Sequence, residues 1–271
     1  MIRTGIFSWF SYPLPLRERL SLIKRAGFDA TSLWWGDEDD ECKNSQPDIA
    51  RELGLDIDYV HAPCDDPDCL WLDGLDGEDY LNTLVSCVDD CSRHGIPTVV
   101  IHITRLSSKP VVSQIGLGRM GRLLDWAEKR QVNLAIENMN DTEHLDYVFA
   151  NLPSDRIGFC YDSGHEHCSH PDADCLSRYG NKLFAVHLDD NWGDDDTHLL
   201  PGDGSISWDI TMEKLKKCRD IPFLTLEVDF NRNHEKSARY FAMSAEEYLS
   251  LAHARLSQLQ NRFLNISKRE R

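Results

Sequence analysis

The chain has 271 residues, enough for one (β/α)₈ barrel or two small domains, and 41% of them are hydrophobic, so that it can form a sizeable core. Its formal net charge of -17, from 46 acidic and 29 basic residues, disfavours binding to nucleic acids and to anionic membranes. No apolar run approaches the ~20 residues of a membrane span, and residues 1–10 lack the basic start and apolar run of a signal peptide. We therefore expect a cytoplasmic protein that does not bind membranes.

Eight short apolar segments recur along the chain, and each is followed by a longer polar or amphipathic stretch. The apolar segments are rich in β-branched residues and often end in a polar residue, which is typical of parallel strands buried on both faces. The predicted strands are residues 4–8, 30–35, 56–61, 98–103, 133–138, 157–162, 184–189 and 224–229.

The stretches between these strands show helical periodicity. The helices predicted most clearly are residues 16–26, 80–94, 113–129, 208–218 and 244–259. Gly27 and Gly95 follow the first two, as expected for residues that end a helix. Ser244 and Glu247 have the spacing of a capping box at the start of the last.

Regular alternation of strands and helices over eight units predicts an α/β protein, a single-domain (β/α)₈ TIM barrel over residues 1–260. A doubly wound sheet is the structural alternative. It would need a glycine-rich first turn to bind a nucleotide, and residues 8–12 contain no glycine. We expect the polar and basic residues 261–271 to form a C-terminal tail that frays.

The nine cysteines are an odd number and are scattered along the chain. The pairs Cys64/Cys69 and Cys87/Cys91 admit a zinc site as an alternative. Free and mostly buried thiols in a reducing cytosol are the interpretation we favour.

Histidine or acidic residues stand at the ends of six predicted strands. These residues are His61, His102, Glu137, Asp162, His187 and Glu227. A single residue of this kind is usually a hydrogen-bonded polar group of the core, but six at equivalent positions are harder to explain in that way. Because the C-terminal ends of barrel strands converge on one mouth, where the active sites of such barrels lie, we expect the six side chains to meet there.

Four of these residues, Glu137, Asp162, His187 and Glu227, come from four neighbouring strands and predict a metal site. Three carboxylates and one imidazole suit one divalent ion, namely Mn²⁺, Mg²⁺, Co²⁺ or Zn²⁺. Without a cation, three such carboxylates would repel one another. Pairing with basic residues is the alternative, but Arg105 is the one basic residue next to a predicted strand end.

A second acidic cluster follows the seventh predicted strand. Asp196 and His198 are two residues apart, which places both side chains on one side of an extended segment, where they could meet a metal ion or sugar hydroxyl groups. For the adjacent Asp194 and Asp195, simple solvation is an equally good interpretation.

These motifs together resemble the xylose isomerase-like barrel superfamily, which contains sugar isomerases and epimerases, inosose dehydratase-like enzymes and endonuclease IV-type apurinic endonucleases. The resemblance covers nearly the whole chain. Each motif is weak alone, but their order and spacing make the resemblance specific. The motifs are VHAP at 60–63, IH at 101–102, IEN at 136–138, DSGH at 162–165, VHLDDN at 186–191, DTHLLPGDG at 196–204 and LE at 226–227.

The resemblance has different implications for the two main branches. In the epimerase-like branch, Glu137, Asp162, His187 and Glu227 would bind one divalent ion, the two glutamates would also be the acid/base catalysts, and His61 and His165 would contact the sugar. In the endonuclease-like branch, three zinc ions would be bound. The positions that match their ligands are His61, His102, Glu137, Asp162, His165, His187, Asp196, His198 and Glu227, and all nine have the required residue type.

Charge favours the first branch, because the loops predicted around the mouth are acidic. They are residues 37–41, 65–68, 73–79 and 189–196. An acidic rim disfavours a DNA duplex and a strongly phosphorylated substrate, but it is harmless to a small neutral sugar. Tryptophans near the strand ends, including Trp9, Trp34, Trp35 and Trp192, could form an apolar wall for a sugar ring or could equally belong to the core.

The sequence thus predicts a metal-dependent sugar isomerase or epimerase that moves a proton next to a carbonyl through an enediolate, with Glu137 and Glu227 as acid and base. The predicted substrate-binding residues are His61, His102, His165, Asp196, His198 and Trp35. The alternatives are a three-zinc endonuclease, an inosose dehydratase-like lyase and a sugar-binding barrel without catalysis. Apolar residues on the outer helices would allow a homo-oligomer.

Overall fold

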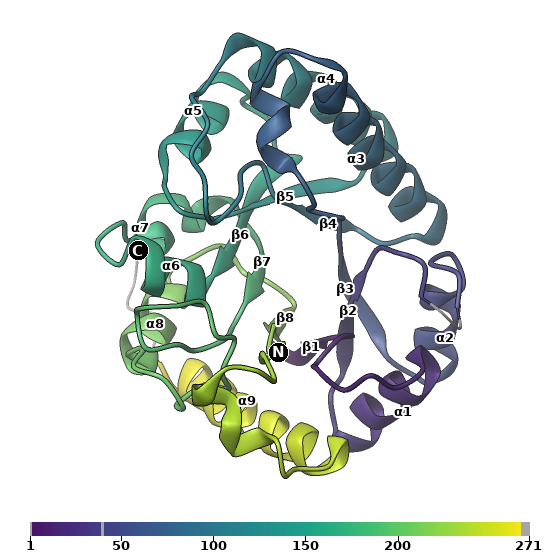
Figure 1. The fold of residues 1–271 in the computed structure, drawn as a ribbon, viewed down its shortest axis with the longest axis vertical. Coiled ribbons are helices and arrows are strands. Elements are labelled where there is room, and N and C mark those ends of the chain that lie inside the picture. The colour runs from purple at the N-terminus through teal and green to yellow at the C-terminus, as the bar shows by residue number, and fades with distance from the viewer. Residues whose placement is uncertain (1, 39–40, 267–271) are drawn as a thin grey trace.

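The computed structural model describes residues 2–38 and 41–266, which form a ring of strands with helices outside it (Figure 1). All eight strands are parallel, in the order β7-β6-β5-β4-β3-β2-β1-β8. The strands are β1 (Arg3–Phe7), β2 (Ala30–Trp34), β3 (Asp56–His61), β4 (Thr98–Ile101), β5 (Asn133–Glu137), β6 (Ile157–Asp162), β7 (Leu183–His187) and β8 (Phe223–Leu226). The predicted TIM barrel is therefore confirmed, and each strand end lies within three residues of its expected position.

β7 and β8 are the first and last strands of this order. They meet near their C-terminal ends and close the barrel. The backbone N–H of Leu188 donates to the carbonyl of Thr225 (2.9 Å), and the N–H of Glu227 donates to the carbonyl of Leu188 (3.3 Å). Closure therefore takes place at the C-terminal end of the barrel and fixes the backbone of Glu227 beside β7.

The helices pack outside the strands and bury an amphipathic face against them. They are α1 (Leu16–Ala26), α2 (Gln46–Glu52), α3 (Leu75–His94), α4 (Gln114–Arg130), α5 (Glu143–Asn151), α6 (Ser163–Ser169), α7 (Cys175–Tyr179), α8 (Trp208–Leu215) and α9 (Ala245–Asn265), with 3₁₀ turns η1 (Pro67–Trp71), η2 (Gly180–Lys182) and η3 (Glu235–Tyr240). None of the described helices is both long enough and apolar enough to cross a membrane.

The last helix corrects the predicted C-terminal tail. The capping box of Ser244 and Glu247 is present at its start. The helix then continues to Asn265, because Phe263 and Ile266 extend its apolar stripe and pack against the core. Residues 261–265 are thus helical, Ile266 follows directly after the helix, and residues 267–271 of the expected tail lie outside the described residues.

A small separate cluster of apolar side chains fills the inside of the barrel. It comprises Tyr59, Val100, Ala135, Cys160 and Ala185. Each of these residues lies two positions before one of the polar strand-end residues found in the sequence, and side chains two apart in a strand point to the same side. The polar residues therefore form the next layer toward the mouth, directly above this apolar floor.

All nine cysteines are free thiols in the structure, as the sequence predicted.

Candidate metal centre and active site

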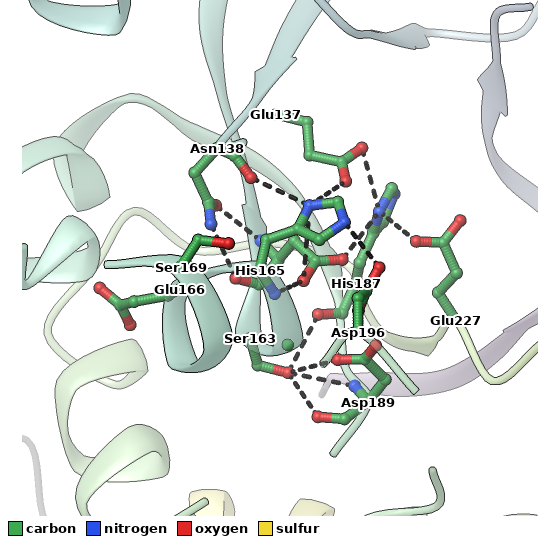
Figure 2. Close-up of polar contacts among 12 residues, drawn as sticks. Glu137, Asn138, Ser163, His165, Glu166, Ser169, His187, Asp189, Asp196 and Glu227 are labelled. Carbon is green, nitrogen blue, oxygen red and sulfur yellow. Dashed lines mark hydrogen bonds and ion pairs between the residues drawn. The ribbon is translucent and has the colours of Figure 1, made fainter. Parts of the chain in front are cut away.

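Four strand ends bring the predicted metal ligands to one point. Glu137, Asp162 and His187 are the last residues of β5, β6 and β7, and Glu227 directly follows β8. One potential ligand atom from each of the four lies within 4.8 Å of the others. The side chains of Asp162 and His187 are completely buried, and those of Glu137 and Glu227 are nearly so. Figure 2 shows the carboxylates of Glu137 and Glu227 pointing toward the imidazole of His187.

The Nδ1 atom of His187 lies at the centre of this group. It is 2.6 Å from Oε2 of Glu227, 3.2 Å from Oε2 of Glu137 and 3.5 Å from Oδ2 of Asp162. Three carboxylates therefore converge on one ring nitrogen, an arrangement that requires positive charge at the centre.

The pKa shifts show how this group is balanced without a metal ion. Burial is the largest influence on the Glu227 carboxyl and raises its pKa, but the charge and the hydrogen bond of His187, together with the charge of His61, outweigh burial and hold that pKa at about 2. Burial likewise lowers the pKa of His187, and the acidic groups of Cys160, Glu137 and Glu227 outweigh burial and raise it well above its ordinary value. One imidazolium thus supplies the positive charge that a divalent cation would supply more fully.

The residues present fit a divalent cation. Oε1 of Glu137, Oδ2 of Asp162 and both ring nitrogens of His187 are buried and make no hydrogen bond of good geometry among the described residues, although charged members of the same cluster lie close to them. Buried polar atoms without partners are rare in folded proteins, and metal coordination is one accepted reason for them. Oxygen-rich ligand sets with one imidazole suit Mn²⁺, Mg²⁺, Co²⁺ or Zn²⁺.

Two further histidines approach Glu137, one at the end of β3 and one directly after β4. Nε2 of His61 is 3.4 Å and Nε2 of His102 is 3.1 Å from Oε2 of Glu137. Nδ1 of His61 donates to the carbonyl of Ala62 (2.8 Å), so Nε2 is the ring nitrogen that could serve as a metal ligand. Burial lowers the pKa of His102 more than Glu137 raises it, so this ring is neutral near pH 7.

The third group combines the α6 histidine with the predicted Asp196-x-His198 pair. Oδ2 of Asp196 is 3.2 Å from Nε2 of His165 and 3.0 Å from Nε2 of His198. His165 also reaches Oε1 of Glu137 through Nδ1 (3.0 Å), which joins this group to the first. His198 adopts a left-handed backbone conformation (φ 45°), which is uncommon outside glycine and tends to persist at functional sites.

A cavity of about 970 Å³ opens above these groups. It is lined by the predicted site residues His61, His102, Glu137, His165, Asp196, His198 and Glu227, and by the aromatic residues Phe7, Trp9 and Trp34. Asp162 and His187 are not among the lining residues. Of the four predicted ligands, the two glutamates are therefore the ones that a substrate in this cavity can touch.

Trp35 is a correction to the expected substrate-binding set. Its ring is buried in the core, and its indole N–H donates to Oδ2 of Asp90 in α3 (2.8 Å), so it faces away from the cavity. β2 ends one residue earlier than predicted, and neighbouring residues face opposite sides, so Trp34 lines the cavity instead. The Trp34 ring stacks on His61, with ring centroids 5.5 Å apart.

The rim is acidic in part. Asp37, Glu38 and Asp65 line the cavity, together with Asp229, which the sequence did not single out. Arg105 also lines it, but its guanidinium forms an ion pair with Asp66 (3.1 Å) and donates to the carbonyl of Asp65 (2.8 Å).

Asp194 and Asp195 are outside the cavity lining. They form ion pairs with Lys236 and His234 that tie the loop after β7 to the segment after β8. The interpretation of these two residues as solvated loop residues therefore suits their positions better than a role in the site.

Sequence reasoning also missed residues that hold the site from behind. Asn138 and Ser163 belong to recognised motifs but had no assigned role, and Asp189, with Oδ2 3.2 Å from Nδ1 of His198, was treated as part of an acidic run. Their position one or two residues after a ligand in the chain was the available signal.

The model of one protein family, described as xylose isomerase-like TIM barrel, matches residues 20–244 of the chain. Among solved structures, this structure is similar to that of L-ribulose 3-epimerase (TM-score 0.76, 17% identity, covering 100% of both chains). It is also similar to that of the IolI protein with a bound zinc atom (TM-score 0.76, 18% identity, covering 98% of this chain and 100% of the other). It is also similar to D-psicose 3-epimerase in the presence of D-fructose (TM-score 0.73, 13% identity, 97% and 99%). At these identities the likeness shows the fold.

Two curated relatives are named as uncharacterised proteins. Protein y4fM of Sinorhizobium fredii is 30% identical over 181 residues, which are 62% of this chain and 56% of the relative, so that the match spans about half of that protein. Protein MJ1311 of Methanocaldococcus jannaschii is 25% identical over 220 residues, 73% of this chain and 72% of the relative. The family match over most of the chain, with the closed eight-stranded barrel, establishes that the chain belongs to the xylose isomerase-like TIM barrel family.

Proposed function

We propose that the protein is a metal-dependent isomerase or epimerase of a small, uncharged sugar. The observation that carries the proposal is the placement of Glu137 and Glu227. They stand on β5 and after β8, on either side of the strands that bear Asp162 and His187, and both border the cavity. Two carboxylates that flank a substrate from separate strands are what proton removal and proton return require.

A divalent ion held by Glu137, Asp162, His187 and Glu227 would polarise the substrate carbonyl and stabilise the negative charge of the enediolate. One glutamate removes the proton from the carbon next to the carbonyl, and the other returns a proton. Return to the opposite face of the same carbon gives an epimer, whereas return to the neighbouring carbon gives an aldose–ketose isomer.

The remaining polar residues position the sugar. His61, His102, His165 and His198 present ring nitrogens at the cavity wall, and Asp196 presents a carboxylate there, so each can bind a hydroxyl group. Trp34 and Trp9 offer partly exposed rings on which the C–H face of a sugar can stack. The acidic rim and the internal pairing of Arg105 favour an uncharged substrate. A cytoplasmic location and homo-oligomer formation remain predictions.

The test follows solvent deuterium into the C–H positions of a panel of ketoses, with protein loaded with Mn²⁺, Mg²⁺, Co²⁺ or Zn²⁺. On a responsive sugar, Glu137→Gln and Glu227→Gln should each lower exchange by about 10²–10⁴-fold, the usual contribution of a general acid or base. Glu143→Gln is the matched control, because Glu143 is exposed at the start of α5 and lies outside the cavity lining. Wild-type exchange rates in both site variants would refute the acid/base assignment.

A second candidate is a three-zinc phosphodiesterase of the endonuclease IV type. The observation that favours it is that three groups of potential ligands lie at one mouth of the barrel. They are the four-residue centre described above, His61 with Glu137 and His187, and His165 with Asp196 and His198. The acidic rim opposes it, because a duplex brings many phosphates. About three zinc ions per chain with cleavage of abasic-site DNA would establish this candidate, and one ion without cleavage would exclude it.

Two other functions are compatible with the same cavity. An inosose dehydratase-like lyase would remove the same kind of proton but expel a neighbouring hydroxyl group as water, so its product is lighter by one water than the substrate. A binding protein without catalysis would bind sugar but exchange no deuterium. Mass analysis of the products in the exchange experiment separates both from an isomerase or epimerase.

A further inference from the structure

Side chains continue the hydrogen bonding of the sheet beyond the ends of the strands that carry the metal ligands. Asn138 directly follows Glu137. Its Nδ2 donates to the carbonyl of Asp162 (2.9 Å), and its Oδ1 accepts from the backbone N–H of Asp162 (2.8 Å). The amide group thus pairs with Asp162 on β6 as the backbone of a neighbouring strand would, past the last paired residues Glu137 and Cys160.

A second side chain links the next two strands in the same way. The hydroxyl of Ser163, which directly follows Asp162, donates to the carbonyl of Asp189 (2.8 Å) and accepts from the backbone N–H of Asp189 (3.0 Å). The last sheet pair here is Asp162 with His187, so the serine again extends the ladder beyond its end. The fit is close, because a Cβ atom on Gly164 would lie 2.3 Å from Oδ1 of Asp189.

A third link completes the series between the loop after β7 and the end of β8. Nδ1 of His198 donates to the carbonyl of Glu227 (3.1 Å). One side-chain link therefore lies between each pair of neighbouring ligand-bearing strands. We call Asn138, Ser163 and His198 the polar belt.

The first two links are buried, so the backbone groups that they pair cannot bond to bulk water instead. Asn138, Asp162 and Asp189 are completely buried, and Ser163 is nearly so. A buried backbone N–H or carbonyl without a partner is strongly unfavourable, so loss of either side chain must be answered by entry of water or by movement of the strand ends. In the first case the affected backbone is that of the ligand Asp162, and in the second it is that of Asp189, two residues after the ligand His187.

We propose that Asn138 and Ser163 are positioning residues that set the spacing of the ligand-bearing strand ends and thereby the affinity of the site for a divalent cation. This inference rests on the metal centre of the proposed function. Residues that orient ligands from behind change metal affinity by about 10–100-fold when they are removed. Asn138 and Ser163 have no place in the cavity lining, so their effect passes through the backbone that they hold.

The experiment measures the Kd for Mn²⁺ and for Zn²⁺ by competition with a chromogenic chelator, on wild type, Asn138→Ala and Ser163→Ala. Asn133→Ala is the matched control for the first variant, because Asn133 is at the opposite end of the same strand and bonds to Thr98 and Arg156. Ser32→Ala is the control for the second, because Ser32 is buried in β2 and its hydroxyl has no partner among the described residues.

We expect the Kd to rise about 10–100-fold in Asn138→Ala and in Ser163→Ala, and to stay within about threefold of wild type in both controls. A purely structural role would lower the melting temperature of a variant without changing its Kd, so unchanged affinity in both folded variants overturns the inference. If Asn138→Ala does not fold, Ser163→Ala decides alone. A wild-type protein that binds neither ion would refute the metal centre itself, and that result is separate from any result on the variants.

Discussion

A buried carboxyl group inside the barrel, Asp58, gives the sharpest prediction about stability. β2 and β3 pair with a bulge, since Thr31 pairs with Ile57 but Leu33 pairs with Val60. Asp58 lies in this bulge, is 6% exposed, and accepts a hydrogen bond from Thr225 Oγ1 (2.6 Å). β3 and β8 are not neighbours in the sheet, so this bond crosses the inside of the barrel.

Burial is the largest influence on Asp58 and raises its pKa from 3.8 to about 7, although the hydrogen bond from Thr225 opposes the shift. Below pH 3.8 the group is protonated in the folded and the unfolded chain and has no effect on the pH dependence of stability. Between pH 3.8 and 7 the unfolded chain loses the proton and the folded chain keeps it, so stability falls as pH rises. Above pH 7 the loss is complete, at about 4 kcal/mol for a shift of about three pKa units.

Asp58→Asn removes this loss and keeps an acceptor for Thr225. Relaxation around a buried charge reduces such penalties, so we expect the variant to gain about 2–4 kcal/mol at pH 8.5, or a rise in Tm of about 4–7 °C for a chain of this length. At pH 5 the gain should be smaller by about 1–3 kcal/mol. Comparing the two pH values cancels any effect of the amide that does not depend on pH.

The assay is urea unfolding with a chelator present, at pH 5 and pH 8.5, of wild type, Asp58→Asn and Asp56→Asn. Asp56 is the control on the same strand: its side chain is 57% exposed and pairs with Arg3, so its loss should cost less than about 1 kcal/mol. An Asp58→Asn gain that is equal at the two pH values would show that Asp58 is ionised in the folded protein throughout, and the argument from burial would fail.

Three other changes have outcomes that follow from the structure. Mn²⁺ at one hundred times its Kd should add about 2.7 kcal/mol, or about 5 °C in Tm, and His187→Ala should abolish this rise in a thermal shift assay. Trp34→Ala should raise KM for a responsive sugar, because the Trp34 ring lines the cavity and stacks on His61. Trp35→Phe should leave kcat/KM unchanged but lower stability by about 1–3 kcal/mol, because it leaves buried Asp90 without the indole donor; the reverse pattern for the two tryptophans would contradict their placement.

The barrel and the convergence of the polar residues could be predicted because both depend on simple periodicities. Alternating strands and helices specify a parallel barrel, and residues at the ends of parallel strands meet at one mouth whatever the details of the loops. Glu137, Asp162, His187 and Glu227 needed no more than this, and the structure brings potential ligand atoms of all four within 4.8 Å of one another.

The orientation of single side chains could not be predicted, because it depends on one residue of register. β2 ends at Trp34 and not at residue 35, and an error of one residue exchanges the inner face for the outer one. The bulge in β3 has the same consequence. It brings Asp58 to Thr225 and the adjacent Tyr59 ring to His187 (ring centroids 5.3 Å apart), although strict alternation would send one of the two outward.

The polar belt could not be predicted from the sequence for a different reason. Asn138 and Ser163 are ordinary residues for a turn after a strand, and nothing in their spacing shows that their partners are backbone groups of the next strand. The belt residues and the carboxylates at the mouth differ in their hydrogen bonding. The belt residues Asn138 and Ser163 satisfy the backbone completely at these points. Beside them, one buried oxygen each of Glu137, Asp162 and Asp189 makes no hydrogen bond among the described residues and faces a histidine ring nitrogen, at 3.0, 3.5 and 3.2 Å respectively. Several buried carboxylates gathered around histidines, without hydrogen bonds of their own, destabilise a fold unless they bind something. The contrast with the fully paired backbone therefore argues that these carboxylate oxygens are kept for a cation and a substrate, and that the belt exists to hold them in place.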